Sequence, residues 1–229
     1  ILGTQNVIDA AIDQKVKKAI LISTDKAAQP VNLYGSTKLC AEKLFISGNS
    51  YASLETQFSC TRYGNVMGSR GSVIEILLRN PDQSTVHITH EEMTRFWINL
   101  EQSFRVVIFT LNIMSGGEIV VPKIPSMKIT DLFKTLAPQA TQKVTGIRPG
   151  EKLHEVLLTI EEARHAIELD DYFIILPEHD EIFDNKNRFK KILAKGKKLP
   201  LNFTYTSDAN KHWLTKEAFG KILKLIRHV

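Results

Sequence analysis

The sequence predicts an α/β fold built on a parallel sheet, and three observations point to it. Helical and strand-like segments alternate over the first 63 of the 229 residues, which is the pattern of strands connected by helices. The first strand-like run ends in Ser23-Thr24-Asp25-Lys26, and the second is followed by a glycine-rich loop at residues 64–72. Such segments beyond strand ends are where α/β proteins bind ligands.

The individual elements are predicted from apolar periodicity and from glycine and proline positions. Pro30 lies in a loop between the first strand and the second helix. That helix begins at Tyr34 and continues to about Ser47, where Gly48-Asn49-Ser50 is expected to end it. The full set is helices at 2–15, 34–47, 73–79, 100–114, 128–136 and 215–226, strands at 18–23, 57–63, 86–88, 118–121, 143–148 and 170–177, and a turn at 93–97.

Tyr34 and Lys38 are four residues apart on a predicted helix, so both side chains lie on one face, one turn apart. A phenol is a weak base at neutral pH, and a nearby ammonium group favours its phenolate form. Tyr34 can then take the proton of a substrate hydroxyl while a hydride leaves the same carbon. The spacing alone is common on helices. Its position after a strand that ends in Thr24-Asp25-Lys26 is what indicates catalysis.

The catalytic segment resembles that of the extended short-chain dehydrogenase/reductases. More narrowly, the chain resembles the inverting UDP-N-acetylglucosamine 4,6-dehydratases of bacterial nonulosonate and surface-polysaccharide pathways. This resemblance implies a partial Rossmann-like parallel sheet with a smaller α+β substrate domain. The blocks that carry it, in chain order, are STDKAAQPVNLYGSTKLCAEKLF, RYGNVMGSRGSV, MTRFWI, GGEIVVPKIPSMKITDL and GIRPGEKLHE.

The resemblance implies that water is eliminated across C5 and C6 of a nucleotide sugar after oxidation at C4. Tyr34 takes the C4 hydroxyl proton, Lys38 supports it and reaches the nicotinamide ribose, and Thr24 bonds the C4 oxygen. Asp25 then acts as the acid and Lys26 as the base, which requires both to be neutral, and burial favours neutral forms. Retaining relatives carry Asp-Glu here, so Lys26 matches the inverting group. The alternative for Asp25 and Lys26 is a salt-bridged loop.

The resemblance also implies ligand-binding residues. Val66 is expected to lie against the nicotinamide of NADP, with NAD as the alternative cofactor. Guanidinium groups match phosphate oxygens, so Arg70 and Arg95 are expected to bind the diphosphate, while a surface ion pair is the alternative for each arginine. Glu75 departs from the family pattern, in which proline is usual. The predicted substrate-binding set is Asn65, Arg70, Gly71, Ser72, Thr89, Arg95, Arg148 and Glu151.

Composition narrows the functional class. No apolar run approaches the ~20 residues of a membrane helix, and residues 1–6 do not resemble a secretory signal, so a cytosolic protein is expected. Cys40 and Cys60 fit neither a disulfide framework nor a metal site and are expected to be buried thiols, and no metal is expected. The net charge of +5 suits a diphosphate substrate. The basic run at 186–198 lacks interleaved aromatic residues, so a solvated helix face is favoured over nucleic-acid binding.

Residues 1–72 are expected to be the second half of a dinucleotide-binding domain, and residues 73–229 a substrate domain that interleaves with the sheet around 100–136. The sequence contains no G-x-G-x-x-G after a strand. The resemblance implies about a hundred preceding residues that carry this loop, so the 229-residue chain alone is expected to be inactive and poorly soluble. A homo-oligomer is expected for the complete enzyme. The alternatives are a 4-epimerase and an inactive chain that retains UDP binding.

Overall fold

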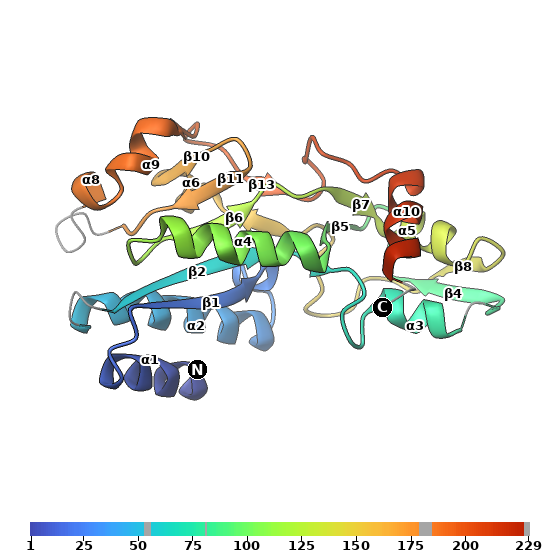
Figure 1. Ribbon diagram of the computed structural model, residues 1–229. Helices are drawn as coiled ribbons and strands as arrows, with labels where there is room; N and C mark the ends of the chain where they lie inside the picture. Colours follow the sequence, from blue (N-terminus) through green and yellow to red (C-terminus); the bar gives the residue numbers. More distant parts are fainter. Residues whose placement is uncertain (53–55, 81, 179–184, 227–229) are drawn as a thin grey trace. The chain divides into compact units, whose positions relative to one another are not determined.

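The computed structural model describes residues 1–52, 56–80, 82–178 and 185–226, and the chain forms two compact units (Figure 1). Unit 1 comprises residues 1–63, 102–123 and 156–205, and unit 2 comprises 64–101, 124–155 and the chain from Thr206 onward. These bounds differ from the predicted domains, because residues 156–205 belong to unit 1, whose sheet they extend. The chain returns to unit 1 at 102–123. The predicted interleaving around 100–136 stays a prediction. The substrate-domain role of unit 2 stays a prediction.

Unit 1 is built on a six-stranded sheet, and its first three strands are parallel. The remaining strands run antiparallel to their neighbours and extend the sheet on one side. The α/β fold class is therefore confirmed. In spatial order the strands are β1 (Lys18–Thr24), β2 (Gln57–Tyr63), β6 (Ile119–Pro122), β11 (Tyr172–Ile175), β10 (Ala166–Glu168) and β12 (Lys197–Lys198).

Helices cover both faces of this sheet. α1 (Leu2–Asp13) and α2 (Leu33–Tyr51) lie on one face, and α4 (Leu100–Ile113) lies on the other (Figure 1). The shorter elements of unit 1 are η1 (Asp25–Ala27), β9 (Val156–Leu158), α6 (Ile160–Ala163), α8 (Asn185–Arg188) and α9 (Lys190–Lys195), and β13 (Tyr205–Thr206) begins at its end.

The prediction that Gly48-Asn49-Ser50 ends α2 was wrong, because the helix continues to Tyr51. Gly48 packs so closely that an added Cβ would stand 3.1 Å from Phe58 and 3.2 Å from Ile8. The Asn49 amide donates to the Phe58 carbonyl (2.8 Å) and accepts from the Phe58 N–H (3.0 Å). Tertiary contacts with β2 therefore override the helix-breaking tendency of these residues.

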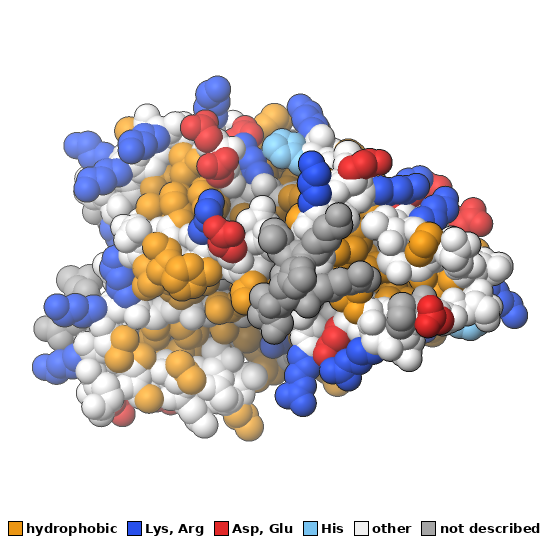
Figure 2. Space-filling model, turned by 45° about the vertical axis from the view of Figure 1, so that its right-hand side comes forward, with side chains coloured by type: hydrophobic (Ala, Val, Ile, Leu, Met, Phe, Trp, Pro, Cys, Tyr) orange, Lys and Arg blue, Asp and Glu red, His pale blue; other side chains and the backbone are white. Residues whose placement is uncertain are grey.

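β1 forms the edge of the described sheet and pairs only with β2. Ile22 of β1 is 57% exposed, although β1 pairs with β2, which is buried from Phe58 onward. Large hydrophobic side chains are also exposed on the helices of unit 1, including Leu33 and Phe104. On the face shown in Figure 2, hydrophobic side chains reach the surface between lysine and arginine side chains that are dispersed among neutral and acidic ones. An open strand edge beside exposed apolar side chains favours association, so poor solubility stays a prediction.

Unit 2 has a compact core of its own, in which Trp97, Met127, Leu132 and Phe219 are each at most 1% exposed. β5 (Thr94–Ile98) lies between its neighbours β3 (Asn65–Val66) and β7 (Ser126–Lys128), and β4 (Thr85–Ile88) pairs in parallel with β8 (Thr141–Val144). The helices are α3 (Val73–Arg79), α5 (Ile129–Leu136) and α10 (Lys216–Ile226).

Two predicted elements of unit 2 were wrong. Residues 93–97 do not form a turn, because Thr94–Ile98 is the fully buried strand β5 and pairs with strands distant in sequence. The strand predicted at 143–148 spans Thr141–Val144 instead. It ends before Gly146, whose φ of +89° lies in the left-handed region that favours glycine and interrupts a strand.

Candidate active site

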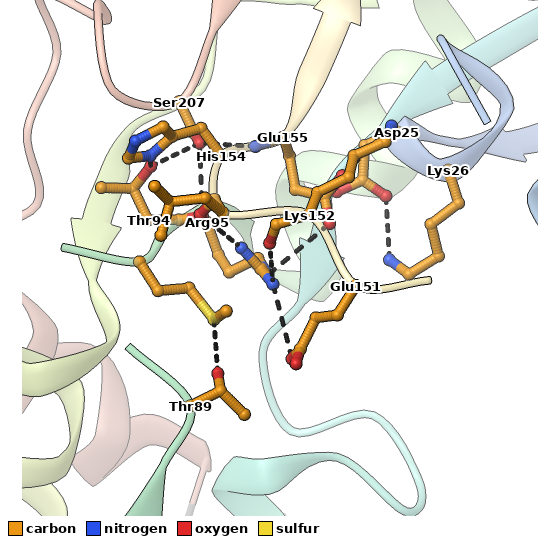
Figure 3. A network of polar contacts seen from close by, with 12 residues as sticks. Asp25, Lys26, Thr89, Thr94, Arg95, Glu151, Lys152, His154, Glu155 and Ser207 are labelled. Atoms are coloured by element: carbon orange, nitrogen blue, oxygen red, sulfur yellow. Dashed lines mark hydrogen bonds and ion pairs between the residues drawn. The ribbon is translucent and has the colours of Figure 1, made fainter. Parts of the chain in front are cut away.

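The end of β1 brings three predicted catalytic side chains together. Thr24 caps η1, and its Oγ1 donates a hydrogen bond to Asp25 Oδ1 at 2.8 Å. Lys26 Nζ stands 3.0 Å from the same carboxylate oxygen (Figure 3). The Asp25 side chain is fully buried, whereas that of Lys26 is 39% exposed. The carboxyl and the amine that the elimination needs are therefore in direct contact, an arrangement that the salt-bridged-loop alternative shares.

The first turn of α2 holds the predicted phenol and amine. Asn32 caps this helix by accepting from the Gly35 N–H at 2.8 Å. Tyr34 is 56% exposed, and Lys38 Nζ lies 5.4 Å from the centroid of its ring. At Gly35 the helix passes so close to η1 that an added Cβ would stand 2.5 Å from the Lys26 carbonyl oxygen. Glycine at this position thus allows the Tyr34 turn to pack directly on the segment that carries Asp25 and Lys26.

Sequence reasoning missed a buried ion cluster beside this segment, formed by Ser23, Glu42, Arg62 and Glu162 and called here the Arg62 cluster. Arg62 of β2 is fully buried and donates to Glu42 of α2 through Nε (2.9 Å) and Nη2 (2.6 Å). It also donates to Glu162 through Nη1 (2.9 Å) and Nη2 (2.8 Å). Ser23 Oγ donates to Glu42 at 2.5 Å.

Charge sets the protonation of the Arg62 cluster. Burial alone would lower the pKa of Arg62, but Glu42 and Glu162 raise it, so the guanidinium stays charged. Burial alone would raise the pKa of Glu162, but Arg62 lowers it below the usual value for glutamate. The sequence signal for this cluster was an arginine inside the predicted strand Gln57–Tyr63, which is buried from Phe58 onward, where an unpaired charge would be costly.

Three of the predicted substrate-binding residues surround the start of α3. Gly71 has a φ of +74°, and Ser72 caps the helix by accepting from the Glu75 N–H at 3.3 Å. The Glu75 carboxylate accepts from the Gly71 N–H and from Arg79 (2.6 Å), which gives this glutamate a local role at the start of α3. Arg70, directly before Gly71, is exposed. Asn65 lies on β3 opposite Trp97, and Val66 lies opposite Ile98.

Arg95 and Glu151 are brought together in a second arginine site. Arg95 is 8% exposed and donates to the backbone carbonyls of Thr94 (2.7 Å), Lys152 (2.9 Å) and Leu153 (3.1 Å). Its guanidinium stands 3.8 Å from Glu151 and 3.6 Å from Glu155 (Figure 3). Arg95 lies on β5, so its bonds to Lys152 and Leu153 hold residues 148–155, the RPGEKLHE motif, against this strand. A diphosphate contact by Arg95 stays a prediction.

The same block is tied to β5 by hydroxyl groups that sequence reasoning missed. Thr94 Oγ1 is 2.8 Å from His154 Nδ1 and 2.6 Å from Ser207 Oγ, and Ser207 accepts from the Glu155 N–H at 2.9 Å (Figure 3). Thr94 and Ser207 are buried. The predicted substrate residue Thr89 instead donates to the sulfur of Met93 at 3.1 Å. Arg148 is exposed, and its N–H donates to Glu151 at 3.3 Å.

The remaining composition-based predictions concern cysteines, metals and membranes. Cys60 is buried as expected, and burial raises the pKa of its thiol, whereas Cys40 is partly exposed. The described residues contain no group of three metal-ligating side chains. Among the described helices, none combines the length and the apolar character that crossing a bilayer requires.

Comparison with known proteins places this geometry in context. Residues 1–177 match the family model described as polysaccharide biosynthesis protein. The chain is 45% identical over 230 residues to the inverting UDP-N-acetylglucosamine 4,6-dehydratase of Campylobacter jejuni subsp. jejuni serotype O:2, covering 99% of this chain and 68% of that protein. It is 38% identical over 231 residues to the UDP-glucose 4-epimerase of Rickettsia rickettsii, covering 98% of this chain and 67% of that protein.

A solved structure shares the fold. The X-ray structure of Pen from Bacillus thuringiensis superposes with a TM-score of 0.84 and 34% sequence identity, covering 100% of this chain and 68% of that one. The similarity therefore extends over both units and includes every block on which the resemblance was based. The resemblance drawn from the sequence is confirmed at the level of the family.

Proposed function

Because the chain belongs to the polysaccharide biosynthesis protein family, we propose that it is a C5-inverting UDP-N-acetylglucosamine 4,6-dehydratase. Its pathway would be nonulosonate or surface-polysaccharide biosynthesis. The observation that carries the proposal is the contact between the buried Asp25 carboxyl and the Lys26 amine at 3.0 Å. Elimination of water needs an acid and a base side by side, and an epimerase does not. The 45% identity to an inverting dehydratase supports the same reading.

The first half of the reaction uses α2 and the end of β1. Tyr34 accepts the proton of the C4 hydroxyl, and Lys38 lies one turn away on the same helix with its Nζ 5.4 Å from the centroid of the tyrosine ring. Thr24 bonds the C4 oxygen and fixes its position. A bound NADP, or NAD in its place, would supply the acceptor and donor of hydride. The exposed ring of Tyr34, near the end of β1, suits the nicotinamide end of such a cofactor. Lys38 is the proposed contact to the nicotinamide ribose, and Val66 is the proposed contact to the nicotinamide ring.

The second half uses the contacting pair. The C4 ketone makes the C5 proton acidic, and Lys26 in its neutral form removes it. Asp25 in its protonated form gives a proton to the C6 hydroxyl, which leaves as water. Loss of water leaves a C5–C6 double bond, an ionised Asp25 and a charged Lys26. Hydride returned to C6 by the bound dinucleotide would accompany addition of a proton to C5 on the face opposite to Lys26, which inverts that centre. The proton that Tyr34 took from the C4 hydroxyl balances this addition, and transfer of a proton from Lys26 to Asp25 restores both groups.

Unit 2 supplies the predicted contacts to the UDP-sugar. Arg70 and Arg148 are exposed and carry the charge that a diphosphate requires, and Arg95 lies next to Glu151 in the block expected to hold the nucleotide. The same proposal includes Asn65, Gly71, Ser72 and Thr89 as sugar or phosphate contacts. We further propose a cytoplasmic enzyme, because its substrate class is an activated nucleotide sugar. We propose a homo-oligomer because large hydrophobic side chains such as Leu33 and Phe104 are exposed on the helices of unit 1.

Lys26→Ala tests the proposal in a form of the protein that turns over UDP-N-acetylglucosamine. A dehydratase loses the base, so release of the 4-keto-6-deoxy sugar is expected to fall at least 10²-fold. The matched control is Lys43→Ala, whose lysine lies on α2 with a 63% exposed side chain and is expected to leave the rate unchanged. Product is followed by NMR of the sugar C6 methyl group. An unchanged rate in Lys26→Ala contradicts the dehydratase.

The alternative function is a UDP-sugar 4-epimerase, which the 38% identity to the Rickettsia protein favours. An epimerase needs Tyr34 and Lys38 but not Lys26. Lys26→Ala would then retain C4 epimerisation, whereas Tyr34→Phe would abolish it. UDP binding with no turnover and no NADP binding, measured by titration calorimetry on the 229-residue chain, would instead support an inactive chain that retains the nucleotide site.

A further inference from the structure

The Arg62 cluster joins three elements at the points where they meet the proposed active site. Ser23 directly precedes Thr24 on β1, and Arg62 is the penultimate residue of β2. Glu42 lies on α2, one turn beyond Lys38 and two turns beyond Tyr34. A carboxylate held from both strands therefore sits on the same helix as the proposed catalytic phenol and amine.

The Arg62 guanidinium has no freedom to rotate. An arginine has five N–H donors in a planar fork, and here they engage Glu42 twice, Glu162 twice and the Leu157 carbonyl once. Two parallel bonds to one carboxylate fix orientation as well as distance. Arg62 therefore fixes the position of the Glu42 carboxylate. Because Arg62 lies on β2 and Glu42 lies on α2, the same bonds fix the rotation of α2 about its own axis.

A second fixed point lies at the start of the same helix. The backbone at Gly35 meets the Lys26 carbonyl with no room for a Cβ, and Asn32 caps the turn. Between Gly35 and Glu42 the helix carries Lys38, and Tyr34 lies directly before Gly35. Two fixed points define both the position and the rotation of a helix, whereas either one alone leaves it free to turn.

We infer that Glu42 is a positioning residue, which, through Arg62 and Ser23, orients Tyr34 and Lys38 toward the Thr24-Asp25-Lys26 segment. This inference rests on the proposed function for its catalytic consequence but not for its structural one. A buried ion pair often adds little net stability compared with apolar packing, and its best-documented benefit is to specify one arrangement among several. Ser23, Glu42 and Arg62 are buried and the Glu162 side chain is 14% exposed, and together they serve that purpose here.

The structural arm of the test needs no activity. The 229-residue chain is labelled with 3-fluorotyrosine, and the Tyr34 resonance is identified by its absence in Tyr34→Phe. Glu42→Gln keeps the shape of the side chain but removes its charge, and it is expected to shift or split the Tyr34 resonance. Ser23→Ala, which leaves the ion pair in place, is expected to shift it less. The control is Glu118→Gln, at a buried carboxyl directly before β6, which is expected to leave the Tyr34 resonance unchanged.

The catalytic arm is a double-mutant cycle. Glu42→Gln is expected to lower kcat about 10²-fold, the scale of a 1 Å misplacement, with KM changed less than about twofold because the predicted nucleotide contacts lie in unit 2. In a Tyr34→Phe background the same change is expected to cost less than about twofold, since Glu42 acts through Tyr34. A purely structural role would lower activity equally in both backgrounds.

The outcomes separate the two claims. A Tyr34 resonance at the wild-type position in both Glu42→Gln and Ser23→Ala overturns the positioning role, whether or not the chain turns over. If Glu42→Gln does not fold by circular dichroism, Ser23→Ala decides the same question alone. Loss of dehydration in Lys26→Ala supports the dehydratase function. If Glu42→Gln then lowers activity equally with and without Tyr34→Phe, the positioning role of Glu42 is overturned. An unchanged rate in Lys26→Ala contradicts the dehydratase function, and a shifted Tyr34 resonance in Glu42→Gln still supports the positioning role of Glu42.

Discussion

Two buried arginines, one in each unit, are held by different kinds of partner. Arg62 in unit 1 is matched by two carboxylates within hydrogen-bond distance. Arg95 in unit 2 is held mainly by backbone carbonyls, and its carboxylate neighbours stand 3.6 and 3.8 Å away. Charge-to-charge bonds in a planar fork lock an orientation, whereas carbonyl bonds hold the group but leave its charge less compensated. The first arrangement suits a fixed internal joint, and the second suits a group that also attracts an anion.

Removing each guanidinium is expected to give the largest effect and to test this contrast. Arg62→Ala leaves two buried carboxylates without a counter-charge, which is expected to destabilise the fold by about 3–5 kcal/mol. Arg95→Ala removes hydrogen bonds to carbonyls and is expected to cost about 1–3 kcal/mol. Urea unfolding of both variants gives the values. Equal losses would show that the two sites hold their arginines alike.

Much of the fold followed from local pattern, as the catalytic segment illustrates. The apolar run before Thr24 and the helical spacing around Tyr34 are short-range signals, and both elements lie where they were predicted. The misplaced turn at 93–97 is a strand because β3 and β7 pair with it, and no local pattern specifies those partners. The same limit applied at Gly48, where packing on Phe58 extends the helix.

The candidate site divides in the same way. Thr24, Asp25 and Lys26 are consecutive, so their contact was accessible from sequence. Arg62 instead meets one carboxylate 20 residues away and another 100 residues away, and Thr94 meets a serine 113 residues away. The tertiary fold determines which residues meet across such long separations, and the sequence alone does not identify the partner. A charged residue inside a buried strand signals that a partner exists without identifying it.

The pH dependence of stability tests how partners control charge within unit 1, because the pKa values of two carboxyl groups there shift in opposite directions. Arg62 lowers the pKa of Glu162 despite its burial, so the stability that Glu162 contributes is lost as the pH falls below about 4.5 through its folded pKa. Burial raises the pKa of Glu118, which outweighs the hydrogen bond that its carboxylate accepts from the Ser115 N–H. Its ionisation therefore reduces stability as the pH rises above 4.5 through its folded pKa.

Urea midpoints measured from pH 3 to pH 8 in roughly unit steps test both signs, since each unit of pKa shift corresponds to about 1.4 kcal/mol. Glu118→Gln is expected to be more stable than the native chain at pH 7. Glu162→Gln is expected to be less stable near neutrality and to lose less stability in acid. If Glu118→Gln were destabilising at pH 7, the raised pKa of this carboxyl would be contradicted.

The smallest effect is expected at an exposed pair in unit 2, which shows what burial adds to the two arginine sites. Lys128 Nζ lies 2.8 Å from Glu92, closer than either carboxylate approaches Arg95, and hydrogen bonding lowers the pKa of Glu92 and raises that of Lys128. Water and salt screen such a pair, and holding two long side chains costs entropy. Lys128→Ala is therefore expected to leave the unfolding midpoint unchanged at physiological ionic strength. A loss as large as that of Arg95→Ala would mean that short distance, and not burial, sets the strength of these contacts.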